Sequence, residues 1–193
     1  MTEVAAVILA AGAGSRLGGL AKALLARRDG TTFLASILAS ARAAGAGDVI
    51  VVVGPPHGDA IAVHARELGC RIVVNPTPER GMASSVAIGF AELTGSTHQA
   101  AWLWPVDHPD VRPDTLRELS AALGSHAAVR PVYRGKGGHP PLISHVLWPQ
   151  LAECGDVAGG ARAVLAEADV LDLAVEDPGC IRDIDTPEDL ETR

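Results

Sequence analysis

The sequence predicts an α/β domain with a mostly parallel sheet and helices on both of its faces. Three observations lead to this prediction. Short apolar runs alternate with runs of helical periodicity along the chain. The apolar runs contain almost no polar residues, as in strands that are covered on both faces. The length of 193 residues suits one domain, and 48% hydrophobic residues are enough to fill its core.

The alternation is clearest before residue 125. Strands are expected at Val4–Leu9, Val49–Val53, Arg71–Val74 and Ala100–Pro105, and helices at Thr32–Ala44, Asp59–Leu68, Ser84–Leu93 and Pro113–Leu123. Ligands of such folds bind at the carboxyl ends of the strands. The loops after Leu9, Val74 and Trp104 are therefore the first places to look for a site.

The rest of the chain is less regular. Strands are expected at Ala127–Val132, Pro141–Ile143 and Asp169–Val175, a glycine-rich turn at Gly135–Gly138, and helices at Val146–Leu151, Gly160–Glu167 and Thr186–Glu191. We interpret residues 127–160 as an insertion in a single domain that spans residues 1–193.

Composition excludes several classes of protein. A net charge of −7 and only 3% aromatic residues argue against nucleic-acid binding, which needs a basic surface or stacking side chains. Three scattered cysteines without a CxxC pair predict neither a disulfide framework nor a zinc site and suit a reducing cytoplasm. The apolar run Val4–Ala11 is too short to cross a bilayer, and no signal peptide is recognised. We expect a cytoplasmic protein without a membrane partner.

A glycine-rich loop follows the first strand and reads Leu9-Ala10-Ala11-Gly12-Ala13-Gly14-Ser15-Arg16-Leu17-Gly18-Gly19, with Lys22 shortly after. Its glycines allow backbone N–H groups to approach a phosphate chain, and its two cations can neutralise one. The dinucleotide fingerprint requires glycine where Leu17 stands, and the P-loop requires Gly-Lys-Ser/Thr, so neither fits. An ordinary turn with two solvated charges is the alternative.

With this loop, the chain resembles the molybdenum cofactor cytidylyl- and guanylyltransferases of the MobA-like NTP transferase family. Four more segments carry the resemblance: Asn75 with Arg80-Gly81-Met82-Ala83-Ser84-Ser85-Val86-(x2)-Gly89, then Val106-Asp107-His108-Pro109, Gly137–Leu142 and Ile181–Leu190. Together the five segments cover nearly the whole chain in order. The resemblance implies a three-layer α/β/α modified Rossmann nucleotidyltransferase fold. Ala21 departs from the family, which often has proline there.

The resemblance also implies binding roles. Base and triphosphate would be wrapped by the loop backbone of Leu9, Ala10, Ala11, Gly12 and Gly14, and the phosphates would be neutralised by Arg16 and Lys22. Base and ribose would be held by Asn75, Gly81 and Ser85. His139 would contact the acceptor phosphate. Residues 127–160 would then lie on the acceptor side. The residues alone also allow purely structural interpretations, in which Ser84 and Ser85 cap a helix and His139 belongs to a tight turn.

Asp107 is the strongest single candidate. A carboxylate at the carboxyl end of a buried strand suits Mg²⁺, and the corresponding aspartate of the family binds the metal. Asp183 and Asp185 alternate on an extended segment and share one face, so one or both would complete the magnesium site. His108 stands where the family often has glutamine or threonine. We expect it at the surface or in support of Asp107 rather than on the metal.

The implied reaction moves a nucleoside monophosphate from an NTP to a phosphorylated small molecule, a molybdopterin-type cofactor, with release of pyrophosphate. Lys22 would stabilise charge on the α-phosphate in the transition state, and Arg16 would hold the β- and γ-phosphates. CTP is favoured because Ala11 is the form more common among cytidylyl enzymes.

Five alternatives are open or excluded on stated grounds. A guanylyltransferase that uses GTP, a sugar- or polyol-phosphate nucleotidyltransferase, and a non-catalytic protein that delivers nucleotide or cofactor to a molybdoenzyme remain open. A nicotinamide dehydrogenase disagrees with the glycine spacing, and seven histidines without HExxH argue against a zinc hydrolase.

Overall fold

The computed structural model describes residues 3–12, 14, 18–185 and 189. Within them one sheet has the strand order β3-β2-β1-β4-β7-β5-β6, and β8 pairs with β5. The strands are β1 Val4–Leu9, β2 Ala46–Val53, β3 Arg71–Val74, β4 Ala100–Pro105, β5 Ala128–Tyr133, β6 Lys136–Gly137, β7 Leu142–Ser144 and β8 Val170–Ala174. The predicted α/β fold with a mostly parallel sheet is confirmed.

The sheet has a parallel half and a mixed half. Strands β3, β2, β1 and β4 are parallel neighbours, the order of one half of a Rossmann sheet. The short strand β7 then runs antiparallel between β4 and β5, while β8 is parallel to β5. Residues 127–160 thus contribute β5, β6 and β7 to the same sheet as the parallel half.

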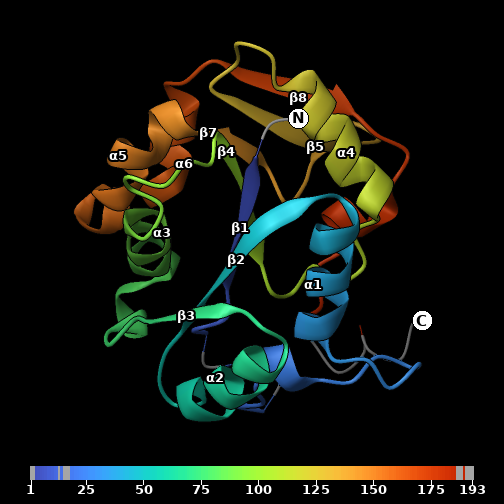
Figure 1. Cartoon of the computed structure of the whole chain (residues 1–193), viewed down its shortest axis with the longest axis vertical. Helices are drawn as coiled ribbons and strands as arrows, with labels where there is room; N and C mark the ends of the chain where they lie inside the picture. Colours follow the sequence, from blue (N-terminus) through green and yellow to red (C-terminus); the bar gives the residue numbers. More distant parts are fainter. Residues whose placement is uncertain (1–2, 13, 15–17, 186–188, 190–193) are drawn as a thin grey trace.

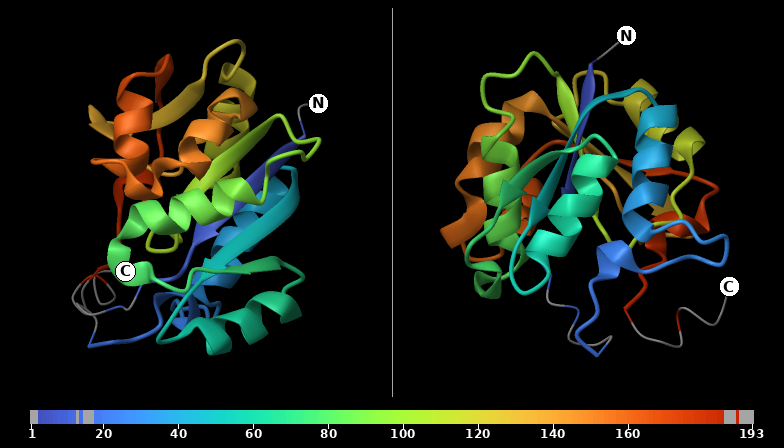
Figure 2. Two further views of the ribbon diagram at one scale, coloured as in Figure 1. Left: turned by 90° about the vertical axis from the view of Figure 1, so that its left-hand side faces the viewer. Right: turned by 60° about the horizontal axis from the view of Figure 1, so that its bottom comes forward.

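Helices cover both faces of the sheet, as Figures 1 and 2 show. The helices are α1 Phe33–Ala43, α2 Gly58–Glu67, α3 Met82–Ala91, α4 Pro113–Ala122, α5 Trp148–Ala152 and α6 Gly160–Ala166. One layer holds α1, α2 and α4, and the opposite layer holds α3, α5 and α6 (Figure 1). In the described part of the chain, no helix is both long and apolar enough to cross a membrane.

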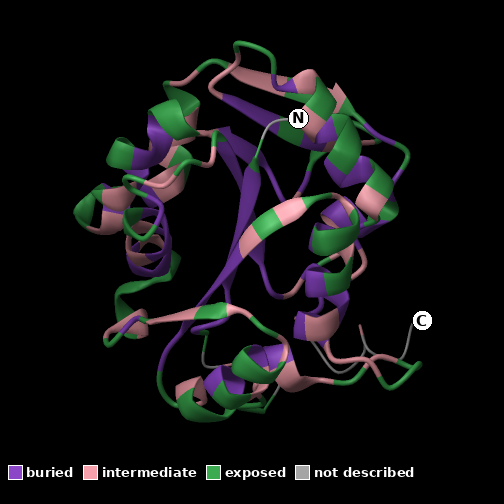
Figure 3. Cartoon of the chain, in the orientation of Figure 1, coloured by how far each residue is buried: buried purple, intermediate pink, exposed green. Residues whose placement is uncertain are grey.

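Strand β1 shows why the sequence folds in three layers. All six of its side chains are buried (Figure 3). Val4, Ala6 and Ile8 join the apolar core under α1, α2 and α4, whereas Ala5, Val7 and Leu9 join the core under α3 and α5. Because side chains of a strand alternate between faces, a strand with apolar residues at every position needs a cover on both.

Some boundaries differ from the sequence-based expectation. Strand β2 begins at Ala46 rather than Val49, since the ladder to β1 continues through Ala46 and Asp48, whose backbones pair with Val4 and Ala5 although the segment is not an apolar run. Four short 3-10 helices were not expected, because they have no apolar periodicity from which to predict them. They are Lys22–Leu24, Pro78–Arg80, Cys154–Asp156 and Pro178–Ile181. The helix expected at Thr186–Glu191 lies, except for Asp189, outside the described residues.

Candidate active site

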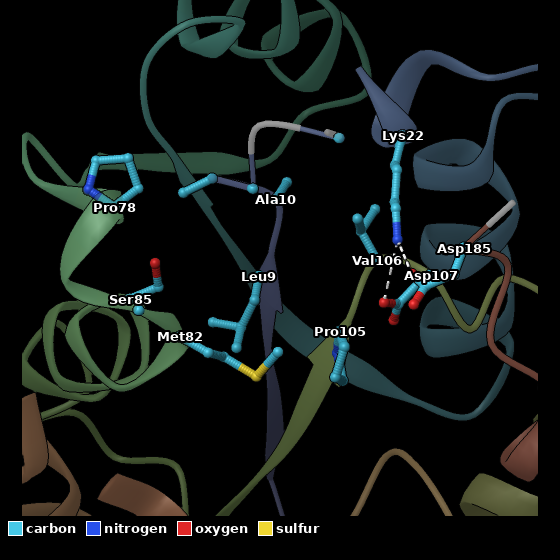
Figure 4. A pocket seen from close by; sticks show the side chains of 14 residues that line it. Leu9, Ala10, Lys22, Pro78, Met82, Ser85, Pro105, Val106, Asp107 and Asp185 are labelled. Atoms are coloured by element: carbon cyan, nitrogen blue, oxygen red, sulfur yellow. Dashed lines mark hydrogen bonds and ion pairs between the residues drawn. The ribbon is translucent and has the colours of Figure 1, made fainter. Parts of the chain in front are cut away.

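A cavity of about 420 Å³ opens at the carboxyl ends of β1 and β4, where α/β folds place their ligands. Figure 4 shows its lining residues. They are Leu9, Ala10, Ala11, Gly12, Gly14, Lys22, Pro78, Gly81, Met82, Ser85, Pro105, Val106, Asp107 and Asp185. One wall is therefore backbone from the glycine-rich loop, and the far end carries the charged groups.

The glycine-rich loop leaves the sheet at the end of β1. The backbone N–H of Ala10 still donates to the carbonyl of Val52 on β2, at 2.8 Å, before the chain turns away. Gly14 has φ +62°, and a Cβ at this position would lie 1.9 Å from the carbonyl oxygen of Leu20. The loop can close here only with glycine, which brings its backbone over the cavity.

Three charged side chains from distant parts of the chain meet at the cavity. Lys22, at the start of a 3-10 helix, donates to the carboxylate of Asp185 and lies 3.5 Å from Oδ2 of Asp107 (Figure 4). The backbone N–H of Ile184 donates to the carbonyl of Asp107, at 2.9 Å, and fastens the C-terminal segment beside the end of β4. One ammonium thus sits against two carboxylates.

The two carboxylates have the chemistry of a divalent-metal site. Carboxylate oxygens are the ligands that Mg²⁺ and Mn²⁺ prefer, and Asp107 and Asp185 already converge on one cation, the ammonium of Lys22. Oδ1 of Asp107 is buried and has no hydrogen-bond partner in the described part of the chain. A buried carboxylate oxygen without a donor is costly unless a ligand or ion satisfies it.

Two histidine rings, those of His108 and His139, pack together next to Asp107 and do not line the cavity. His108 is only 7% exposed, and its Nε2 lies 3.8 Å from Oδ1 of Asp107. The rings of His108 and His139 have their centroids 4.9 Å apart. Burial, and next the neighbouring His108, lower the pKa of His139 to about 4, although Asp183 opposes the shift. His139 is therefore neutral at pH 7 and cannot neutralise a phosphate by charge.

The loop between β3 and α3 is organised by Asn75. This side chain is fully buried, and its amide donates to the hydroxyls of Ser84 and Ser85 at 2.8 and 2.9 Å. Its carbonyl oxygen accepts from the backbone N–H of Thr77, at 3.0 Å. Asn75 thereby holds the turn that carries Pro78, Gly81 and Met82 to the cavity, and it does not line the cavity itself.

The structure brings together most of the residues that the sequence singled out. Leu9, Ala10, Ala11, Gly12, Gly14, Lys22, Gly81, Ser85, Asp107 and Asp185 all line the cavity, whereas Asn75, His139 and Asp183 do not. Arg16 lies outside the described residues. Pro78, Met82, Pro105 and Val106 were missed. Met82 and Val106 stand inside recognised segments and Pro78 and Pro105 next to them, but apolar lining residues look like ordinary core, so none was singled out.

Fold and site together define a protein of the nucleotidyltransferase class. Residues 6–172 match the family of MobA-like NTP transferase domains. The chain belongs to this family, which confirms the resemblance found in the sequence.

Several known proteins are similar to this chain. Nicotine blue oxidoreductase of Paenarthrobacter nicotinovorans is 33% identical over 97% of this chain and 94% of its own. The crystal structure of Rv0371c from Mycobacterium tuberculosis H37Rv has 30% sequence identity and a TM-score of 0.82, and the match covers 99% of this chain and 97% of that one. The complex of Rv0371c with manganese has 28% identity and a TM-score of 0.77, with the same coverage of both chains. The bifunctional protein GlmU of Xanthobacter autotrophicus is 37% identical over 64% of this chain but only 27% of its own length.

Proposed function

We propose that this protein moves a nucleoside monophosphate from an NTP to a phosphorylated small molecule and releases pyrophosphate, with a divalent metal ion, Mg²⁺, as cofactor. The observation that carries the proposal is the cluster of Lys22, Asp107 and Asp185 at the end of the glycine-rich loop. Two phosphates have to meet in such a reaction. The main task of the site is therefore to neutralise and orient negative charge.

The residues divide this task between them. The backbone of the loop up to Gly14 would receive the triphosphate and, with Ser85 and Met82 opposite, enclose base and ribose. The ammonium of Lys22 would leave the carboxylates and meet the α-phosphate, where charge builds during the attack. Arg16 would hold the β- and γ-phosphates. The acceptor phosphate is already ionised, so no protein side chain is needed as a strong base.

Asp107 and Asp185 would hold the metal ion, with Asp183 less suited because it does not line the cavity. Bound there, the ion would reduce the repulsion between donor and acceptor phosphates. His108 and His139 would support Asp107 from behind rather than bind the ion, since both rings lie outside the cavity lining. The manganese complex of the similar Rv0371c is consistent with a divalent ion in this fold.

The particular substrates are proposed as CTP and a molybdopterin-type phosphate, with a molybdoenzyme as the recipient of the product in the cytoplasm. Ala11 supports CTP: it is 3% exposed and lines the cavity, so its methyl group limits the space at one wall. Family membership supports the acceptor. GTP and sugar or polyol phosphates are the alternatives within the same chemistry.

A screen of pyrophosphate release tests this proposal. Each of the four NTPs is combined with molybdopterin and with sugar and polyol phosphates, with Mg²⁺, Mn²⁺ or a chelator. We expect release with CTP and molybdopterin, dependent on the metal, and a weaker preference for CTP over GTP in Ala11→Gly. Equal or better use of GTP would overturn the choice of nucleotide. No release with any pair would overturn the activity itself.

An oxidoreductase is the second candidate, favoured by the 33% identity to nicotine blue oxidoreductase over 97% of the chain. The parallel order β3-β2-β1-β4 suits either activity, because it is also the order of dinucleotide-binding sheets. The site favours phosphate chemistry, since hydride transfer has no need of a lysine between two carboxylates. Oxidation of NADH or NADPH with nicotine blue as the electron acceptor, unaffected by Lys22→Met, would support the second candidate over the first.

A further inference from the structure

A second cavity, of about 590 Å³, lies between residues 27–29, 110–112 and 177–182. Four arginines line it, Arg27, Arg28, Arg112 and Arg182. This is a concentration of positive charge in a chain whose net charge is −7. We propose that the cavity binds a phosphate-type oxyanion, either inorganic phosphate or the phosphoryl group of a small molecule. This inference does not rest on the proposed function.

The most buried carboxylate at this cavity is already satisfied by the protein. Asp177 is 2% exposed and accepts hydrogen bonds from the backbone N–H groups of Arg112 and Gly179, at 2.9 and 3.0 Å, and from the hydroxyl of Thr115, at 2.7 Å. It also lies 3.5 Å from Nε of Arg112. These donors satisfy the oxygens of Asp177, and the nearby Arg112 guanidinium offsets its negative charge, so Asp177 mainly positions the segment that follows it.

The remaining two carboxylates at the cavity, Asp29 and Asp110, are paired with arginines, and Oδ2 of Asp29 lies 3.8 Å from Nη1 of Arg27. Asp110 lies between Arg27 and Arg182, with N–O distances of 3.1 and 4.0 Å. Arg27 also donates to the hydroxyl of Ser36, at 2.7 Å, and its buried Nε has no partner in the described part of the chain. A guanidinium that is fixed in this way loses little freedom when an oxyanion arrives, and guanidinium groups match oxyanions with paired hydrogen bonds.

The two outer arginines remain accessible. The side chain of Arg112 is 56% exposed and that of Arg182 is 38% exposed, so a solvated anion can reach them. Arg28 lines the same cavity and is exposed. Four guanidiniums line the cavity together with three carboxylates, those of Asp29, Asp110 and Asp177, so the formal charge of the lining is one positive charge, which favours an anion.

The second cavity shares its three segments with the first. Each of three short stretches of chain contributes one residue to each cavity. The first cavity receives Lys22, Asp107 and Asp185, and the second receives Arg27, Asp110 and Arg182. An anion in the second cavity would therefore sit on the same segments that hold the charged cluster, but outside it.

Binding of inorganic phosphate, followed through the backbone amide signals of the ¹⁵N-labelled protein, tests the proposal. The amides of Arg112 and Gly179 report on the second cavity, and those of Gly14 and Ser85 report on the first. We expect saturable shifts at Arg112 and Gly179 in the wild type. Ribose 5-phosphate, as a second probe, distinguishes the two sources: tighter binding than inorganic phosphate identifies a small-molecule phosphoryl group, and weaker binding identifies free phosphate.

The test variant is Arg28→Gln with Arg182→Gln, and the control is Arg66→Gln with Arg162→Gln. Both double variants remove two positive charges, but Arg66 on α2 and Arg162 on α6 are exposed and line neither cavity. We expect binding at the second cavity to weaken roughly tenfold or more in the test variant, since the variant lacks two charged hydrogen-bond donors. Equal binding in both variants, or shifts confined to Gly14 and Ser85, would overturn the proposal.

Discussion

If Asp107 and Asp185 bind a divalent ion as proposed, Lys22 competes with that ion for both carboxylates, and the competition can be measured. In the structure the ammonium lies 3.5 Å from Oδ2 of Asp107 and donates to Asp185. Lys22→Met removes the charge but keeps the length of the side chain. We expect the variant to bind Mn²⁺ more tightly than the wild type and to lose most of its nucleotidyl transfer, so that affinity and activity change in opposite directions.

The magnitude follows from the charges. At about 4 Å, a divalent ion and an ammonium repel by about 2 kcal/mol in bulk water and about 8 kcal/mol at an effective dielectric constant of 20. The three side chains are between 16% and 22% exposed, and the ammonium can move aside, so the lower end applies. About 1.4–3 kcal/mol corresponds to roughly ten- to a hundredfold tighter Mn²⁺ binding in Lys22→Met.

Mn²⁺ affinity is measured by electron paramagnetic resonance or calorimetry, and kcat by pyrophosphate release. Asp185→Asn is the matched control, because it removes a charge from the other partner of the same ion pair and should weaken Mn²⁺ binding. The kcat of Lys22→Met should fall roughly a hundredfold or more, as for the loss of one preorganised donor to the transition state. Unchanged Mn²⁺ affinity together with a normal kcat would refute both the competition and the catalytic role.

Three further predictions concern activity, acid stability and packing. Asp107→Ala should fold normally and lose about 10³-fold or more in rate, because a metal ligand is removed at a strand end; near-normal metal-dependent activity would contradict this. Since the pKa of His139 falls from 6.5 to about 4 on folding, the stability from its neutral form is present above pH 6.5 and is lost toward pH 4. Denaturant unfolding should therefore show about 2–3 kcal/mol more loss between pH 7 and 4.5 in the wild type than in His139→Asn, and parallel pH profiles would refute the assignment. Gly89→Ala should destabilise by about 1–2 kcal/mol despite the better helix propensity of alanine, because its Cβ would lie 2.5 Å from Cγ1 of Val7. An unchanged melting temperature would show that α3 can move away from β1.

The sequence alone determined the parallel half of the sheet and the place of Asp107. Both depend on local signals. An all-apolar run such as Val4–Leu9 has to be covered on both faces, and a carboxylate two residues after the run Ala100–Pro105 has to emerge where a parallel sheet ends. These inferences need no knowledge of which segments meet in space.

Only the tertiary structure decided which side chains complete the site. Asp183 and Asp185 look equivalent in the alternating sequence, but residues two apart on an extended segment are about 7 Å apart, so one ammonium cannot contact both closely. The hydrogen bond from the N–H of Ile184 to the carbonyl of Asp107 fixes the position of the C-terminal segment beside the end of β4. In this position Asp185 contacts Lys22, which is 163 residues away in the sequence. Burial likewise decided the roles of two other candidates. Asn75 is fully buried and its amide holds a turn, and His139 is neutral because burial lowers its pKa. Spacing in a sequence carries no information on such contacts, because the folding of the whole chain creates both the register and the burial.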